Sequence, residues 1–181
     1  AREGREPKPA QGRGVAVRMS FVGANAPALA AEQQLPGRHN YFLGNDPSKW
    51  RSDVPVYGAV CYRGMQPGID VRAREHDGHF EYDLLLKPGA DLEPVEIAVE
   101  GVERMYVDKG ALVMETQLGP VRMPAPLSWE EGPSGEKSLV ACRYVLRGAD
   151  RFGFEVTARR PDWALIVDPG LVWSTFLGGT G

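Results

Sequence analysis

Apolar and polar side chains alternate with a period of two residues along most of this chain. Phe80, Tyr82 and Leu84, for example, are separated by Glu81 and Asp83. This period is typical of a β-strand with one buried face, because successive side chains of a strand point to opposite faces. Strand patterns occur at residues 15–21, 54–63, 69–74, 80–86, 95–99, 104–108, 111–116, 139–147, 152–157 and 165–168. They predict an all-β, antiparallel domain of about ten or more strands with little or no helix.

Glycine and proline interrupt these segments throughout. The 181 residues include 22 Gly and 15 Pro, spread along the chain, as many short strands joined by tight turns require. Pro120, Pro124 and Pro126 are expected to keep the stretch between them out of any central strand. The one mild helical pattern lies at residues 26–34, where Ala and Gln precede Pro36.

Strands with one apolar face must pack that face on a partner, and in a helix-poor chain the partner is another sheet. The pattern therefore predicts a β-sandwich, with a closed barrel as the alternative. Residues 15–170 are expected to form one domain, since about 180 residues suffice for a single core. Residues 1–14 are polar and rich in Pro and Gly, and we expect a flexible N-terminal segment there.

The charge pattern argues against two classes of partner. The net charge is −3, and Lys and Arg are scattered, so the chain has no basic stripe for nucleic acid. No apolar run approaches the ~18 residues of a membrane span, so no membrane insertion is expected. The chain does not begin with Met, which suggests a processed or trimmed N-terminus and leaves secretion open.

The two cysteines, Cys61 and Cys142, have different expected environments. Cys142 shares the parity of apolar neighbours, whereas Cys61 lies on a mixed face. Two free thiols are therefore the favoured interpretation, with a disulfide as the alternative.

Three carboxylates are candidate catalytic residues. Asp70, Glu81 and Asp83 could supply the pair of acids that glycoside hydrolysis uses. Glu81 and Asp83, however, have the parity of an outward strand face, where a solvated carboxylate is expected. No nucleophile elbow, phosphate-binding loop, dinucleotide fingerprint or zinc-protease motif occurs. We therefore favour a domain without catalytic residues.

No metal or other cofactor is expected. His76 and His79 bracket Asp77-Gly78 at a predicted hairpin tip, where a metal could take two imidazoles and a carboxylate. A zinc site needs three or four ligands on firm supports, and no further His or Cys lies nearby in the sequence. An exposed turn is the favoured interpretation.

Three residues are candidate ligand-binding residues. Trp129 lies next to acidic residues and a loop, and an exposed Trp can stack on a sugar ring. Trp50 follows the Asn-Asp-Pro turn that contains Asp46, and this turn could offer oxygen ligands to calcium. The simpler interpretations are that Trp covers a β-core and that Asp before Pro forms the turn.

Several motifs, weak singly, are specific in combination. They are Asn-Tyr-Phe-Leu-Gly-Asn-Asp-Pro-Ser-Lys-Trp at 40–50, Val-Pro-Val-Tyr at 54–57, Pro-Gly-Ile-Asp at 67–70, Phe-Glu-Tyr-Asp at 80–83, Lys-Pro-Gly-Ala-Asp at 87–91 and Val-Glu-Gly at 99–101. In these motifs the chain resembles the N-terminal domain of bacterial extracellular proteins that carry SBBP (β-propeller) repeats. Residues 166–179 resemble the join to the first repeat, so residues 171–181 are expected to begin a repeat or linker.

The chain differs from that family pattern in places. Residues 71–74, Val-Arg-Ala-Arg, replace a more aromatic strand, and Cys61 and Cys142 replace residues that are not usually Cys. The family also tends to have strands upstream of Val15, so a sheet edge is expected to be open here.

The resemblance implies an exported, extracellular or cell-surface domain without enzymatic activity. We expect a structural or interaction domain that presents loops for adhesion or partner binding. Its expected partners are the downstream repeats of the same polypeptide and a surface polysaccharide or protein. The alternatives are a carbohydrate-binding module and a carbohydrate-active enzyme.

Overall fold

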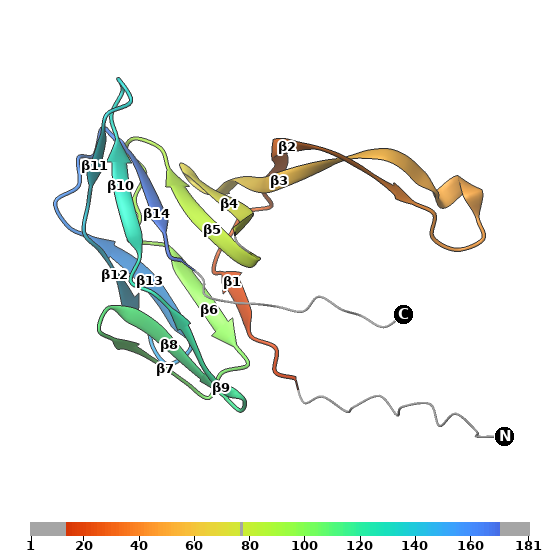
Figure 1. Cartoon of the computed structure of the whole chain (residues 1–181). Helices are drawn as coiled ribbons and strands as arrows, with labels where there is room; N and C mark the ends of the chain where they lie inside the picture. The colour runs from red at the N-terminus through yellow and green to blue at the C-terminus, as the bar shows by residue number, and fades with distance from the viewer. Residues whose placement is uncertain (1–13, 77, 171–181) are drawn as a thin grey trace.

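The computed structural model describes residues 14–76 and 78–170, which form a β-sandwich with a long projecting hairpin (Figure 1). Fourteen strands and one short 3-10 turn, η1, account for its regular structure. Their bounds are β1 Arg18–Phe21, β2 Ala28–Tyr41, η1 Pro47–Lys49, β3 Arg51–Gln66, β4 Ile69–His76, β5 His79–Leu86, β6 Glu96–Glu100, β7 Arg104–Asp108, β8 Ala111–Thr116, β9 Gly119–Met123, β10 Leu127–Glu131, β11 Lys137–Leu139, β12 Cys142–Leu146, β13 Arg151–Val156 and β14 Ala164–Asp168. The prediction of an antiparallel all-β domain is confirmed.

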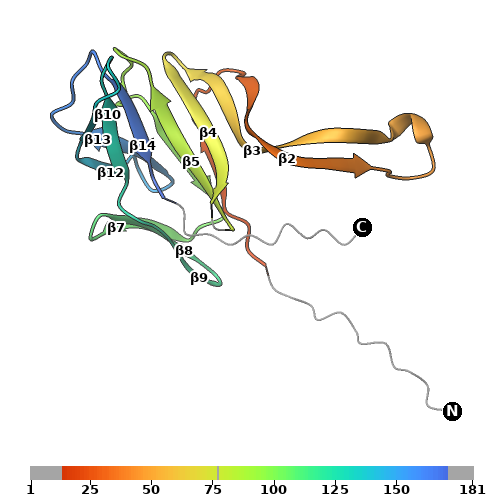
Figure 2. The same ribbon diagram turned by 45° about the horizontal axis from the view of Figure 1, so that its top comes forward.

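Three antiparallel sheets make up the fold. The four-stranded sheet has the order β1-β6-β13-β12, and the seven-stranded sheet has the order β11-β10-β14-β5-β4-β3-β2. These two form the layers of the sandwich, with β10, β14 and β5 in front of β12, β13 and β6 in Figure 1. The third sheet, β7-β8-β9, lies at one end of the sandwich, as both ribbon views show (Figure 2).

The core lies between the layers. The seven-stranded sheet contributes Leu84 and Leu165, and the four-stranded sheet contributes Phe152 and Phe154. Met114 of the small sheet completes the same cluster. The predicted alternation is clear in β5, where Tyr82, Leu84 and Leu86 all belong to the core cluster.

A long hairpin made by β2 and β3 extends away from the sandwich (Figure 1, Figure 2). We call residues 33–57 the arm. Every residue from 33 to 53 is exposed, whereas Ala59 and Cys61, nearer the sandwich, are buried. The β2–β3 pairing continues along the arm to Tyr41 and Arg51, with an irregularity between Gln34 and Arg38. Because residues 33–53 are exposed, this backbone pairing rather than a core holds the arm.

The helical expectation for residues 26–34 is wrong. Most of this stretch belongs to β2, where Ala28, Ala30 and Glu32 pair with β3. The helix propensity of Ala and Gln is a weak preference, and a ladder of backbone hydrogen bonds to β3 outweighs it.

Strands β9, β10 and β11 were not predicted from the alternation. Pro120 nevertheless behaves as expected, because β9 is an edge strand of its sheet. The proline-rich stretch ends before β10 begins at Leu127. Both cysteines are free thiols, with Cys61 buried on the side of the sheet that carries Arg72 and Cys142 packed at the margin of the core.

Several expectations lie outside the described residues. The flexible segment at 1–14, apart from Gly14, and the start of a repeat at 171–181 are among them. Asp77, between the two hairpin histidines, is another. Within residues 14–76 and 78–170, no helix is long and apolar enough to cross a membrane.

Candidate functional site

Four of the predicted site residues share the outer face of the seven-stranded sheet, the face turned away from the core. The pairing register brings them together: Trp129 is opposite Ile166, Ile166 is opposite Leu85, and Leu85 is opposite Asp70. One row thus joins a Trp on β10 to a carboxylate on β4, although the two are far apart in the sequence.

The next rows of the same face carry the other two carboxylates. Arg72 pairs with Asp83 and Arg74 pairs with Glu81, so β4 supplies cations opposite the acids of β5. Cross-strand neighbours lie close enough for opposite charges to interact. The sheet therefore gathers Asp70, Glu81 and Asp83 beside two arginines.

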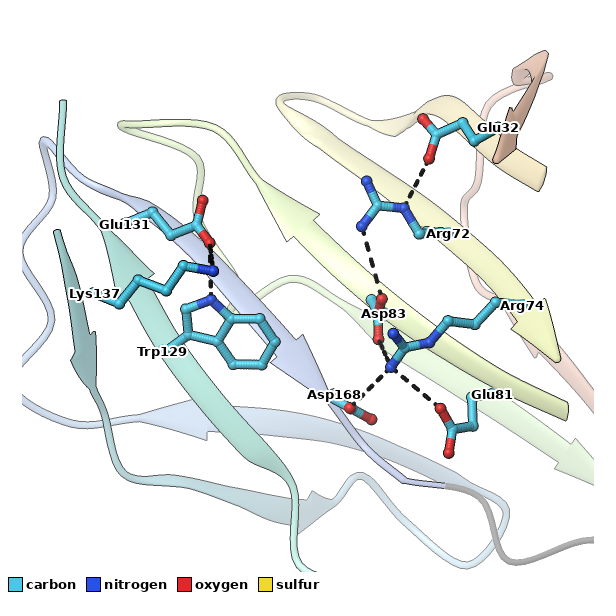
Figure 3. Close-up of polar contacts among 9 residues, drawn as sticks. All are labelled: Glu32, Arg72, Arg74, Glu81, Asp83, Trp129, Glu131, Lys137 and Asp168. Carbon is cyan, nitrogen blue, oxygen red and sulfur yellow. Dashed lines mark hydrogen bonds and ion pairs between the residues drawn. The ribbon is translucent and has the colours of Figure 1, made fainter. Parts of the chain in front are cut away.

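Arg74 is the centre of an ion network (Figure 3). Its Nη2 lies 3.2 Å from a carboxylate oxygen of each of Glu81, Asp83 and Asp168. Nε of Arg72 donates to Glu32 at 2.8 Å, and its Nη1 lies 4.0 Å from Asp83. This network links strands β2, β4, β5 and β14 through side chains as well as through the backbone.

Asp83 is buried, which corrects the expectation that it is solvated. Only 3% of its side chain is exposed, whereas Glu81 on the same face is 18% exposed. The outer face of the sheet is turned toward solvent, but the guanidinium groups of Arg72 and Arg74 lie beside Asp83. Burial raises the pKa of the Asp83 carboxyl, and the nearby Arg74 opposes that rise.

Trp129 is half-buried, and its ring is held by a second polar cluster. The indole Nε1 donates to Glu131 at 3.0 Å, and Lys137 Nζ lies 2.7 Å from the same carboxylate. Lys137 Nζ also lies 5.6 Å from the centre of the indole ring, within the range of a cation–π contact. Hydrogen bonds from Lys137 and Trp129 lower the pKa of Glu131.

A pocket of about 420 Å³ lies between the two clusters. We call it the outer-face pocket, and its lining includes Asp70, Arg72, Arg74, Lys87, Trp129 and Lys137. In Figure 3 the indole of Trp129 extends from β10 across β14 toward the side on which Asp83 and Arg74 lie. The pocket thus combines an aromatic ring with charged donors and acceptors.

Asp46 and Trp50 lie elsewhere, at the tip of the arm. Asp46 caps the short turn η1, with its Oδ1 accepting from the backbone N of Ser48 at 3.0 Å and from the Ser48 hydroxyl at 2.7 Å. The side chain of Trp50 packs against Phe42 with ring centroids 5.4 Å apart and donates to the carbonyl of Gly44 at 3.2 Å. Asp46 therefore serves as a turn former, and Trp50 as part of an aromatic pair.

Arg72, Arg74, Lys137 and Asp168 belong to this face but were not predicted as site residues. The alternation already indicated them in part, because Asp70, Arg72 and Arg74 have one parity within a single strand. The sequence did not indicate that β4 pairs with β5 in the register that places Arg72 opposite Asp83. His76 ends β4 and His79 begins β5, so both backbone positions lie at the tip of the β4–β5 hairpin.

The network favours ion pairing over acid–base chemistry. Glu81, Asp83 and Asp168 share one guanidinium nitrogen, and Asp70 Oδ1 accepts from the backbone N of Gly64 at 2.7 Å. Each acid is thus engaged with a fixed donor, whereas a general acid needs a proton and access to a substrate atom. The arrangement is suited to holding a rigid polar surface.

Comparison with known proteins places the chain in a family of unknown function. No curated protein and no solved structure matches it significantly. The sequence pattern of one family, described as "Domain of unknown function (DUF7948)", matches residues 1–170, nearly the whole chain. The protein whose β-sandwich carries this arm and this outer-face network is therefore a member of the DUF7948 family.

Proposed function

We propose that this domain is a non-enzymatic interaction domain of an exported bacterial surface protein, and that the arm is its contact element. One observation supports this most strongly: the arm projects from the sandwich with its large apolar side chains uncovered. Phe42 is 59% exposed, Leu43 74% and Trp50 40%. Aromatic side chains concentrated at one point are typical of residues that dominate the binding energy of protein interfaces.

Several hydrogen bonds hold the tip of the arm in place. Trp50 is oriented by its bond to Gly44, and Asp46 closes the turn η1. Asn40 Oδ1 accepts from the backbone N of Asp53 at 2.8 Å and so closes the base of the tip. A preorganised tip loses less conformational freedom on binding than a flexible one, which favours affinity.

The exported context comes from the resemblance to domains that precede SBBP repeats. In that context the partners are the downstream repeats of the same polypeptide and a protein or polysaccharide of the cell surface. The loop between β10 and β11, at residues 132–136, is a second contact candidate. Presentation of loops on a rigid sandwich is how many binding domains work.

Binding to isolated cell envelopes of the source bacterium tests this proposal. The double variant Phe42→Ala/Trp50→Ala is expected to sediment with envelopes at least ~10-fold more weakly than the intact domain, as loss of hot-spot aromatics does. Leu139→Ala is the control, because Leu139 is 77% exposed on the sandwich itself. Equal binding by the double variant and the control, or no binding by the intact domain, refutes the role of the arm.

A further inference from the structure

The indole ring of Trp129 forms one side of the outer-face pocket. Trp129 donates its only polar hydrogen to Glu131, and Lys137 is tied to the same carboxylate. The indole is therefore fixed before any ligand arrives. Next to it in the row lie Leu85 and Ile166, which add apolar surface to the pocket lining. A flat ligand face with C–H groups can stack on such a wall.

The opposite side of the pocket is polar and equally fixed. Arg74 is held by three carboxylates and Arg72 by Glu32, as Figure 3 shows. These guanidinium groups cannot rotate freely toward a ligand without losing their ion pairs. Arg72 and Arg74 therefore form a fixed side of the pocket and do not close around a ligand.

Asp70 and Lys87 are lining residues that retain hydrogen-bonding capacity on the accessible side of the pocket. Within residues 14–76 and 78–170, Asp70 uses Oδ1 to accept from Gly64, and its Oδ2 has no hydrogen-bond donor. Lys87 Nζ likewise forms no ion pair in that part of the chain, although Lys87 is exposed and lines the pocket. The pocket therefore offers an acceptor at Asp70 and a donor at Lys87 beside a fixed indole, whereas Nε of Arg74, which also has no hydrogen-bond partner among the described residues, is buried.

The charges of the pocket are mixed. Four cationic residues, Arg72, Arg74, Lys87 and Lys137, line it together with the three acids Asp70, Asp83 and Glu131. Glu32, Glu81 and Asp168 add three further acids that pair with the arginines. A phosphate, sulfate or carboxylate would lie close to uncompensated Asp70, and a cationic ligand would lie close to Lys87. A hydroxyl can both donate and accept, so an uncharged polyol satisfies both groups.

We propose that the outer-face pocket binds an uncharged pyranose unit of a saccharide. The C–H face of the sugar stacks on Trp129, and its hydroxyl groups donate to Asp70 and accept from Lys87. The volume of about 420 Å³ falls within the range of small-ligand pockets, about 300–1,000 Å³. This site is separate from the arm, so saccharide binding can be tested independently of the proposed interaction role of the arm tip.

Titration of the intact chain with defined sugars tests the site. The probes are uncharged glucose, galactose, N-acetylglucosamine and their oligomers, with galacturonate and inorganic sulfate as charged comparisons. Binding is measured by isothermal titration calorimetry, and saturation-transfer NMR identifies the sugar protons that face the protein. At least one uncharged saccharide is expected to bind, and saturation transfer is expected to be strongest at its ring C–H protons.

Variants locate the bound sugar. Trp129→Ala is expected to weaken binding at least ~10-fold, and Asp70→Asn and Lys87→Met each several-fold, in the range of a lost hydrogen bond to a charged group. Asn at position 70 can still accept from Gly64 and Lys87 is an exposed rim residue, so these two variants keep the fold even if Trp129→Ala does not. Trp50→Ala, at the exposed arm tip, is the matched Trp control and is expected to bind normally.

Four outcomes overturn the proposal. They are no binding of any uncharged saccharide, tighter binding of galacturonate or sulfate, unchanged binding in a folded Trp129→Ala variant, and unchanged binding in both Asp70→Asn and Lys87→Met. The envelope experiment on the arm tip is unaffected by any of them, so the two proposals can fail separately.

Discussion

Replacing Arg74 by Met is expected to destabilise the domain strongly. Arg74 Nη2 is 3.2 Å from Asp83, whose side chain is only 3% exposed, and from two further carboxylates. Met keeps the unbranched stem but removes the cation, which leaves a buried carboxylate without its main partner. Breaking a buried ion pair costs about 3–5 kcal/mol. The Arg74 side chain is 29% exposed, so water enters in its place and we expect the lower end, about 3 kcal/mol.

The measurement is equilibrium unfolding in urea at pH 7, with thermal unfolding as a second readout. A loss of about 3 kcal/mol corresponds to roughly 6–12 °C for a domain of this size. The control is Arg143→Met, which removes the partner of Glu155 from a pair whose side chains are 66% and 44% exposed. Exposed pairs contribute about 0.2–1 kcal/mol, so the control should change little. Equal losses in the two variants would refute a special role for the Arg74 network.

The same variant should show a definite dependence on pH. Burial raises the pKa of Asp83 in the folded state, and removal of Arg74 removes the main opposing effect. The folded state then binds a proton more tightly than the unfolded state does. Stability therefore falls as pH rises from the unfolded pKa, about 3.9, to the folded pKa, and acidification restores it. The difference from wild type should shrink as pH falls from 7 toward the unfolded pKa, and Arg74→Met/Asp83→Asn should abolish most of this change.

Three further predictions concern other parts of the fold. Gly101→Ala should lower the free energy of unfolding in urea by more than ~2 kcal/mol, because the φ of Gly101 is +85° and a Cβ there would clash with the carbonyl of Ala16. Gly135 has the same φ but open space around it, so Gly135→Ala should cost only about 1 kcal/mol. Similar costs in the two variants would contradict the close approach of Gly101 to Ala16. Burial raises the pKa of Cys142 to about 11, so only about one thiol in a thousand is ionised at pH 8. Alkylation of Cys142 should therefore be slow until guanidinium unfolds the chain. Rapid labelling of Cys142 in the native protein would contradict that burial. Replacing residues 42–50 by Asn-Gly should leave the melting temperature within a few degrees of wild type, because the removed residues are all exposed, and a large loss would show that the arm tip supports the sandwich.

The candidate site could be predicted only in part, and two residues show why. Trp129 and Asp70 were both identified as candidates from their neighbours in the sequence, yet nothing local indicated that they face one pocket. Their row depends on three successive strand pairings, β10 with β14, β14 with β5 and β5 with β4. Sequence reasoning assigns parity within a strand, but the choice of neighbouring strands depends on contacts far apart along the chain.

The alternation of apolar and polar residues was sufficient to predict antiparallel sheets with one apolar face each. Alternation is a local property, and an apolar face must be buried wherever the strand lies, so residues such as Leu84 and Phe152 were predictable core members. Two features could not be predicted before the sheets were assembled: Asp83 is buried beside Arg72 and Arg74, and residues 28–41 form a strand of the projecting hairpin. The burial of a charge and the state of a weakly patterned segment both depend on which partner lies opposite, and that partner is set by the assembled sheet.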